Sequence, residues 1–178
     1  MLYLWIGFAA IYLLVSFAVH VSTFIGLDPM SRIPGLMLLH VLIFPPFLAA
    51  IFYANRAIKR GAKNQQEIMG RAPKWLTIIS GCFFAYALIN FVLFLILMQG
   101  GTVFEEDGQY TRRTFGREYV QITESEFNRY NNYVARGFSG HWMVFASASL
   151  VLLVGVLALD RDNHKLQATE ASATPTQL

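Results

Sequence analysis

The sequence predicts an all-α membrane protein, a four-transmembrane-helix bundle with a small external β-hairpin plus helix module between helices 3 and 4. Hydrophobic residues make up 55% of the 178-residue chain and charged residues only 14%, against about 25% charged residues in soluble domains. Four long segments contain no Asp, Glu, Lys or Arg, and each has the ~20 residues that a helix needs to cross a bilayer. They are residues 2–27, 33–53, 75–98 and 139–159.

These segments leave little sequence for a soluble core, so residues 1–160 are interpreted as one membrane domain. Backbone N–H and C=O groups inside lipid must bond within the segment, which favours helices. The first segment is too long and lacks the basic start of a cleaved signal peptide, and is therefore expected to be retained. Residues 161–178 are predicted to form a disordered cytoplasmic tail.

The orientation follows from one strongly basic connection. Residues 54–74 carry six basic residues and one acidic residue, a net charge of +5. The positive-inside rule places this connection in the cytoplasm, together with both termini. We therefore expect an integral protein of a bacterial inner membrane with residues 99–140 on the outside. The basic residues serve mainly to set this orientation; binding of anionic lipid is the alternative.

The external insertion, residues 100–138, has the pattern of a small folded module. Asp107-Gly108 is a strong signal for a two-residue hairpin turn. Strands are predicted on both sides of it and once more after it, at 102–105, 109–114 and 118–122. Thr123 and Glu126 then form a capping-box pattern that begins a helix. That helix is expected to meet the fourth span with a bend at Gly137 or Gly140.

One polar residue in each span lies at a similar predicted depth. Each is seven or eight residues from the outer end of its span, or roughly 11–12 Å at 1.5 Å per residue. Polar side chains inside a bilayer usually face the interior of the bundle. Pro45-Pro46 should kink the second span and open space beneath its histidine. The four residues of this layer are His20, His40, Asn90 and Ser147.

Several roles for this layer stay open. Hydrogen bonding between helices is the simplest. A b-type haem held by His20 and His40, a quinone hydrogen-bonded by the same layer, and a proton relay are the others. The size and helix number are similar to those of the bacterial cytochrome b561 family. That dihaem family needs two layers of histidines, whereas His20 and His40 supply one.

The sequence assigns no catalytic residue, no metal site and no nucleic-acid-binding motif. Gly137-Phe138-Ser139-Gly140 reads G-x-S-G and resembles the nucleophile motif of rhomboid-type intramembrane proteases. Those enzymes have more than four spans, so Ser139 is expected only to cap the fourth span.

Two hypotheses about function follow. The first is a non-enzymatic, structural or accessory membrane protein without a cofactor, which binds a membrane or periplasmic protein through residues 100–138; it could also form a homo-oligomer. The second is an electron-transfer protein with haem b or quinone at His20 and His40.

Overall fold

The computed structural model describes residues 1–114, 116 and 119–173, which are mostly helical. Four helical stretches are long and apolar enough to cross a membrane, as the sequence predicts. Those stretches are α1 (Leu2–Phe24), the consecutive helices α3 (Leu38–Leu42) and α4 (Phe44–Lys59), α6 (Lys74–Met98) and α7 (Glu124–Ala173).

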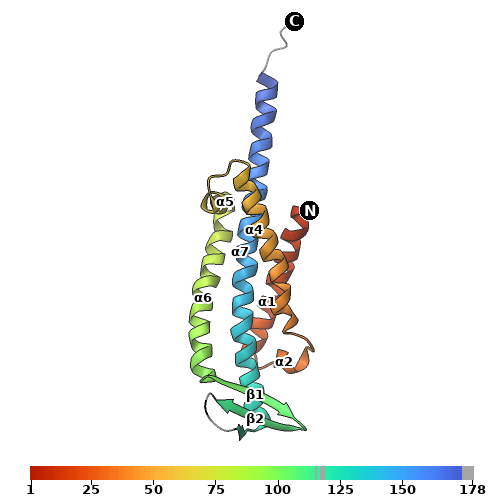
Figure 1. Cartoon of the computed structure of the whole chain (residues 1–178), viewed down its shortest axis with the longest axis vertical. Coiled ribbons are helices and arrows are strands. Elements are labelled where there is room, and N and C mark those ends of the chain that lie inside the picture. Colours follow the sequence, from red (N-terminus) through yellow and green to blue (C-terminus); the bar gives the residue numbers. More distant parts are fainter. Residues whose placement is uncertain (115, 117–118, 174–178) are drawn as a thin grey trace.

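Helix α7 is the centre of the arrangement. Helices α1, α4 and α6 each pack along it, and Figure 1 shows α7 between α1 and α6. In the apolar stretch of α7, 67% of the residues are buried, compared with 17–22% in the other three stretches. The outer helices therefore expose most of their large apolar side chains, as lipid-facing helices do.

The second span is broken at Ile43, between α3 and α4. Pro45 and Pro46 lie in the first turn of α4, where their missing N–H groups are least costly. The Tyr12 hydroxyl donates a hydrogen bond to the carbonyl of Leu39, just before the break. The helical stretch is therefore interrupted beside the two prolines, where the sequence predicts a kink, and a side chain of α1 binds a carbonyl next to the interruption. The short helix α2 (Pro29–Arg32), capped by the Asp28 carboxylate, precedes this span.

The basic connection contains a helix that the sequence analysis did not identify, α5 (Gln65–Arg71). The Asn64 side chain caps it, and Ile68, at its centre, is fully buried. A Cβ atom at Gly155 of α7 would lie 2.1 Å from the Ile68 carbonyl oxygen. Glycine at this position therefore lets the backbones of α5 and α7 come into direct contact.

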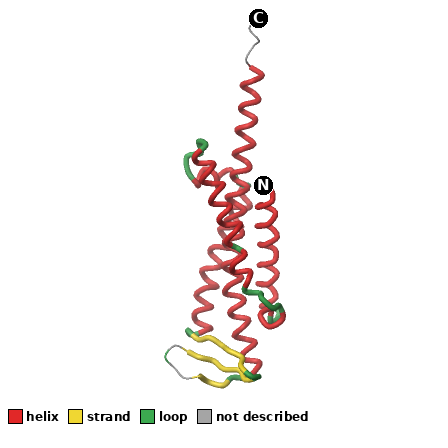
Figure 2. The backbone as a smooth tube through the Cα atoms, turned by 45° about the vertical axis from the view of Figure 1, so that its right-hand side comes forward, coloured by secondary structure: helices red, strands yellow, loops and turns green. Residues whose placement is uncertain are grey.

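At the opposite end of the helices lies an antiparallel sheet of β1 (Gly101–Glu106), β2 (Gln109–Thr114) and β3 (Tyr119–Gln121), in that order. Asp107 and Gly108 both have positive φ, 50° and 73°, as a type I′ hairpin turn requires. The predicted strands are confirmed among the described residues; position 118, where the third was expected to begin, lies outside them. Figure 2 shows the sheet lying across the helix ends.

Helix α7 differs from the prediction at both of its expected boundaries. It runs without interruption from Glu124 to Ala173, so neither Gly137 nor Gly140 separates two helices. Residues 161–173, which the sequence predicts as part of a disordered tail, continue the helix; 174–178 lie outside the described residues. The capping box at Thr123 and Glu126 begins α7, and no proline follows before Pro175.

Candidate functional site

A seven-residue segment of α7, residues 136–142, contacts all three neighbouring spans. Two glycines allow close approach to α6 at this level. A Cβ atom at Gly137 would lie 2.8 Å from Phe94, and one at Gly140 would lie 2.7 Å from the side-chain nitrogen of Asn90. These glycines therefore act as packing positions rather than as a hinge.

His20 of α1 forms hydrogen bonds through both ring nitrogens, one to this segment and one to α6. Its Nδ1 lies 2.8 Å from Ser139 Oγ, and its Nε2 lies 2.7 Å from the hydroxyl of Tyr86 on α6. Ser139 Oγ also lies 2.6 Å from the carbonyl oxygen of Ala135, to which it donates its only proton. His20 Nδ1 must then donate to Ser139, and Nε2 must accept from Tyr86. One neutral imidazole thus connects α1, α6 and α7.

Asn90 of α6 lies beside this group. Its side-chain nitrogen donates to the carbonyl of Arg136, at 2.9 Å. The guanidinium of Arg136 stacks over the ring of Phe24 in α1, 4.4 Å from the ring centroid. Asn90 and His20 are therefore brought to the same short stretch of α7, and both are buried.

His40 reaches the segment from another side. It lies on α3 with an exposed side chain, and its Nδ1 accepts a hydrogen bond of 3.2 Å from the indole N–H of Trp142. Its ring also packs edge-on against Phe138, with centroids 5.2 Å apart. The two histidines of the predicted layer thus bind different residues of α7.

Ser147 lies elsewhere. Its hydroxyl is 3.1 Å from that of Ser80 on α6, and it is seven residues beyond Gly140, about 10 Å along the helix. The predicted depth of Ser147 depends on a span that begins at Ser139, just after the last charged residue before it. The helix instead begins at Glu124, so this starting point does not mark a helix end. Three members of the predicted layer therefore meet at residues 136–142, and Ser147 does not.

Tyr86 and Trp142 are partners that no sequence motif predicts, and Ser139, predicted only to cap a helix, also binds His20. Tyr86 lies one turn from Asn90 on α6, which is the one sequence signal for its place beside the layer. Trp142 and Ser139 carry no such signal, since their partners come from distant parts of the chain.

The contact of Ser139, His20 and Tyr86 has the order of a nucleophile, a base and an orienting group. The geometry nevertheless favours a structural role. Ser139 has no exposed surface, its proton is directed to the Ala135 carbonyl, and a side chain of α6 lies against Gly140. A substrate carbonyl has no approach to Oγ in this arrangement. Among the described residues, no group of three or more His, Cys, Asp or Glu is arranged so that it could hold a metal ion.

The sheet offers a different kind of surface. Its inner face is packed against α7 and α6. Tyr110 stacks on Phe127 of α7, and the Arg112 guanidinium lies 4.5 Å from the ring centroid of Tyr130, also on α7. Arg112 also donates to the Met98 carbonyl at the end of α6. Arg112 thereby places a positive charge at a helix C-terminus, where it is favourable.

The outer face carries three exposed side chains in contact, Phe104, Arg113 and Tyr119, here called the aromatic–arginine patch. The rings of Phe104 and Tyr119 have centroids 6.3 Å apart, and the Arg113 guanidinium lies 5.4 Å from the Tyr119 centroid. Phe104 is 45% exposed and Tyr119 is 61% exposed. The salt bridges of the described residues do not include Arg113.

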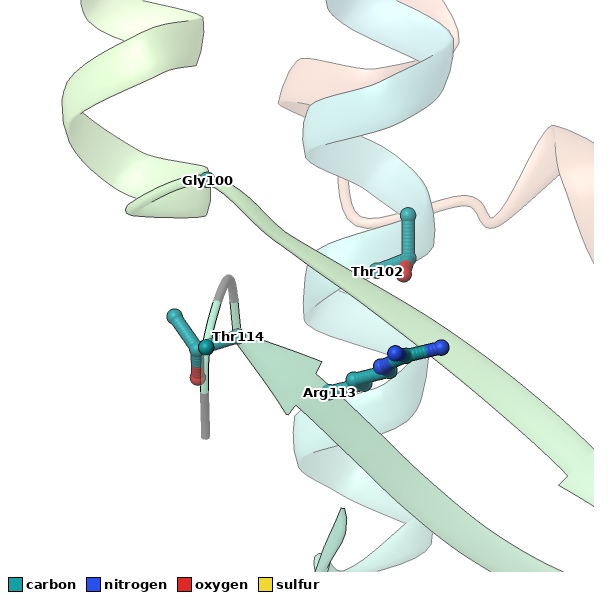
Figure 3. A pocket seen from close by; sticks show the side chains of 5 residues that line it. Gly100, Thr102, Arg113 and Thr114 are labelled. Carbon is teal, nitrogen blue, oxygen red and sulfur yellow. The ribbon is translucent and has the colours of Figure 1, made fainter. Parts of the chain in front are cut away.

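A cleft of about 290 Å³ adjoins this patch. Thr102 and Arg113, which face each other across β1 and β2, form part of its wall (Figure 3). Its lining residues are Gly100, Thr102, Arg113, Thr114 and Gly116. The outer face thus combines an apolar surface, an arginine that forms no ion pair with another described residue, and a recess.

Comparisons with protein-family models, with curated proteins and with solved structures found no match for this chain.

Proposed function

We propose that this chain is a non-enzymatic integral membrane protein that binds a protein partner through the aromatic–arginine patch. The supporting observation is a contrast between its two polar regions. The polar side chains at residues 136–142 bond mainly to one another and to neighbouring helices. The patch instead leaves two aromatic rings and a guanidinium exposed. The exposed side chains of the patch can contact a partner, whereas the polar groups at residues 136–142 already have hydrogen-bond partners within the chain.

The proposed setting is a bacterial inner membrane, with both termini in the cytoplasm and the sheet outside. The basic connection carries a net charge of +5 and lies at the end of the helices opposite the sheet (Figure 1). Placing that end in the cytoplasm satisfies the positive-inside rule. The sheet then faces the periplasm, within reach of periplasmic proteins and of outer portions of other membrane proteins.

The chemistry of the patch indicates what a partner must present. Tyrosine and arginine are enriched among residues that dominate binding energy, because they bury a large area and make directional contacts. Arg113 calls for an acidic side chain, and the rings of Phe104 and Tyr119 call for an apolar neighbour. The proposed partner is therefore a protein segment with a carboxylate next to an apolar side chain.

Site-specific photo-crosslinking in cells tests this proposal. A photoreactive phenylalanine analogue replaces Phe104, and the same analogue at the exposed, lipid-facing Phe84 is the control. We expect one discrete protein adduct from position 104, which is lost in Arg113→Glu and kept in Arg56→Glu, a charge reversal at the other end of the helices. An adduct that survives Arg113→Glu, or no protein adduct at all, would overturn the proposal.

Electron transfer through haem or quinone is the competing function. His20 Nε2 accepts a bond from Tyr86, so Tyr86 would have to move away before this nitrogen could bind iron. Visible spectra of the purified protein, oxidised and then reduced with dithionite, decide between the two. We expect no Soret band; a band that shifts on reduction and disappears in His20→Leu would establish the haem function instead.

A further inference from the structure

A groove of about 490 Å³ lies between α5 and the start of α6, at the end of the helices opposite the sheet. Its wall is mainly apolar, and Lys74 is the one cation among its lining residues. Those residues are Gln66, Met69, Gly70, Ala72, Lys74, Thr77 and Ile78.

Helix α5, which forms one side of the groove, is held in place by contacts along its length. At its start, the Glu67 N–H donates to the Asn64 side chain, and the Glu67 carboxylate accepts from the Lys63 N–H. Ile68 is fully buried against Gly155 of α7. Arg71 forms an ion pair of 2.9 Å with Asp162 of α7. These contacts hold both ends and the centre of α5.

The charges around the groove are unbalanced. The connection between the second and third spans contains six basic residues, and among the described residues only Arg71 of these forms an ion pair. Lys74 begins α6, which has no side-chain N-cap, so its first-turn N–H groups also lack a side-chain acceptor. Trp75 follows and is 62% exposed, as is usual for tryptophan at a membrane surface.

We propose that this groove binds one anionic glycerophospholipid. The phosphate lies against the Lys74 ammonium, and an acyl chain lies along Met69 and Ile78, which are 38% and 65% exposed. A free phosphate would use the cation but not the apolar wall, and a neutral lipid would use the wall but not the cation. This inference needs the chain to be in a bilayer, but not the partner proposed above.

Quenching of tryptophan fluorescence by brominated lipid measures the preference directly. The chain has three tryptophans, at positions 5, 75 and 142. Trp5→Phe removes the first, and Trp142 is fully buried, so Trp75 is the exposed tryptophan that reports on the lipid. The full chain is reconstituted into vesicles of dibrominated phosphatidylglycerol mixed with unlabelled phosphatidylcholine. A second preparation uses unlabelled phosphatidylglycerol mixed with dibrominated phosphatidylcholine. We expect phosphatidylglycerol to be favoured about fivefold at Trp75, the size of one cation–phosphate contact at a membrane surface.

Three further variants, made in the Trp5→Phe chain, locate the site. Lys74→Gln should reduce the preference to near one, whereas Lys59→Gln, which removes an equal charge outside the groove, should leave it unchanged. Gly70→Leu should also remove the preference for phosphatidylglycerol. A Cβ at Gly70 has no atom within 4 Å, so leucine would fill the groove without disturbing α5. Thermal unfolding in detergent confirms that each variant is folded. An equal loss in Lys59→Gln, or no preference before substitution, would overturn the proposal in favour of diffuse charge attraction.

Discussion

His20 and Ser139 are 119 positions apart in the sequence, yet Nδ1 of one lies 2.8 Å from Oγ of the other. The bond connects the first span to the last. Because Ser139 gives its proton to Ala135, the imidazole is the Nδ1–H tautomer and uses its remaining lone pair to bind Tyr86.

A double-mutant cycle measures this bond. We expect His20→Leu and Ser139→Ala each to destabilise the fold, and the pair to show a coupling energy of ~0.6 kcal/mol, the average for side-chain hydrogen bonds between membrane helices. The measurement is unfolding in detergent titrated with a denaturing detergent. Strictly additive effects would mean that the two side chains are neighbours without a stabilising bond.

The contact between Gly155 and Ile68 predicts that a single methyl group displaces α5. In Gly155→Ala the new Cβ would lie 2.1 Å from a backbone oxygen, which cannot move as a flexible side chain would. We expect a loss of about 1–3 kcal/mol and faster proteolysis within residues 60–73. Gly81→Ala is the matched control on α6, since nothing lies within 4 Å of its Cβ; similar behaviour of the two variants would contradict the packing.

Arg112 should hold the sheet against the helices. Its guanidinium lies over Tyr130 and donates to the Met98 carbonyl, so Arg112→Ala removes contacts to α7 and α6 together. We expect faster hydrogen exchange of the amides in 101–114 and 119–121, measured by mass spectrometry in detergent. Arg113→Ala, on the outer face of the same strand, should leave exchange unchanged.

The capping box at the start of α7 should be sensitive to acid. The Glu126 carboxylate accepts bonds from the Thr123 N–H and hydroxyl, which lowers its pKa below the ordinary value of 4.5. Its contribution to stability is therefore complete above pH 4.5 and is lost as the pH falls through the lowered pKa. Carbon-13 NMR of labelled glutamate should show this lowered pKa, and Thr123→Val should raise it by removing the hydroxyl. An ordinary pKa in the unsubstituted protein would rule out the bond in solution.

Cys82, the one cysteine in the sequence, tests insertion into the bilayer. It lies on the exposed surface about a third of the way along α6. In intact membranes a charged, water-soluble thiol reagent should not label it, but should do so after the membrane is dissolved in denaturing detergent. In a Cys82→Ser chain, Lys63→Cys and Asp107→Cys should then be labelled from opposite sides. Labelling of both from one side would contradict the proposed topology.

The helical spans and the hairpin could be predicted because their signals are local: apolar stretches of sufficient length, an Asp-Gly turn and a capping box. Helix α5 was missed because its seven residues resemble a polar loop, and it is stabilised by Gly155, which is far away in the sequence. Similarly, the polarity of His20 and Asn90 places them on inward faces. Which residue each one binds depends on how the helices are rotated and shifted against α7, and no local pattern contains that information.

The central position of α7 also has a consequence for biosynthesis. Three spans precede it in the sequence, and each of them finds most of its packing partners on α7. In the proposed topology, those helices enter the membrane while the ribosome is still making the sheet, before the surface on which they assemble exists. They must remain separate helices in lipid, or be sheltered by the insertion machinery, until residues 136–159 arrive. Assembly of the four helices therefore has to wait for the synthesis of α7, and nascent chains halted before it should be targets for quality control.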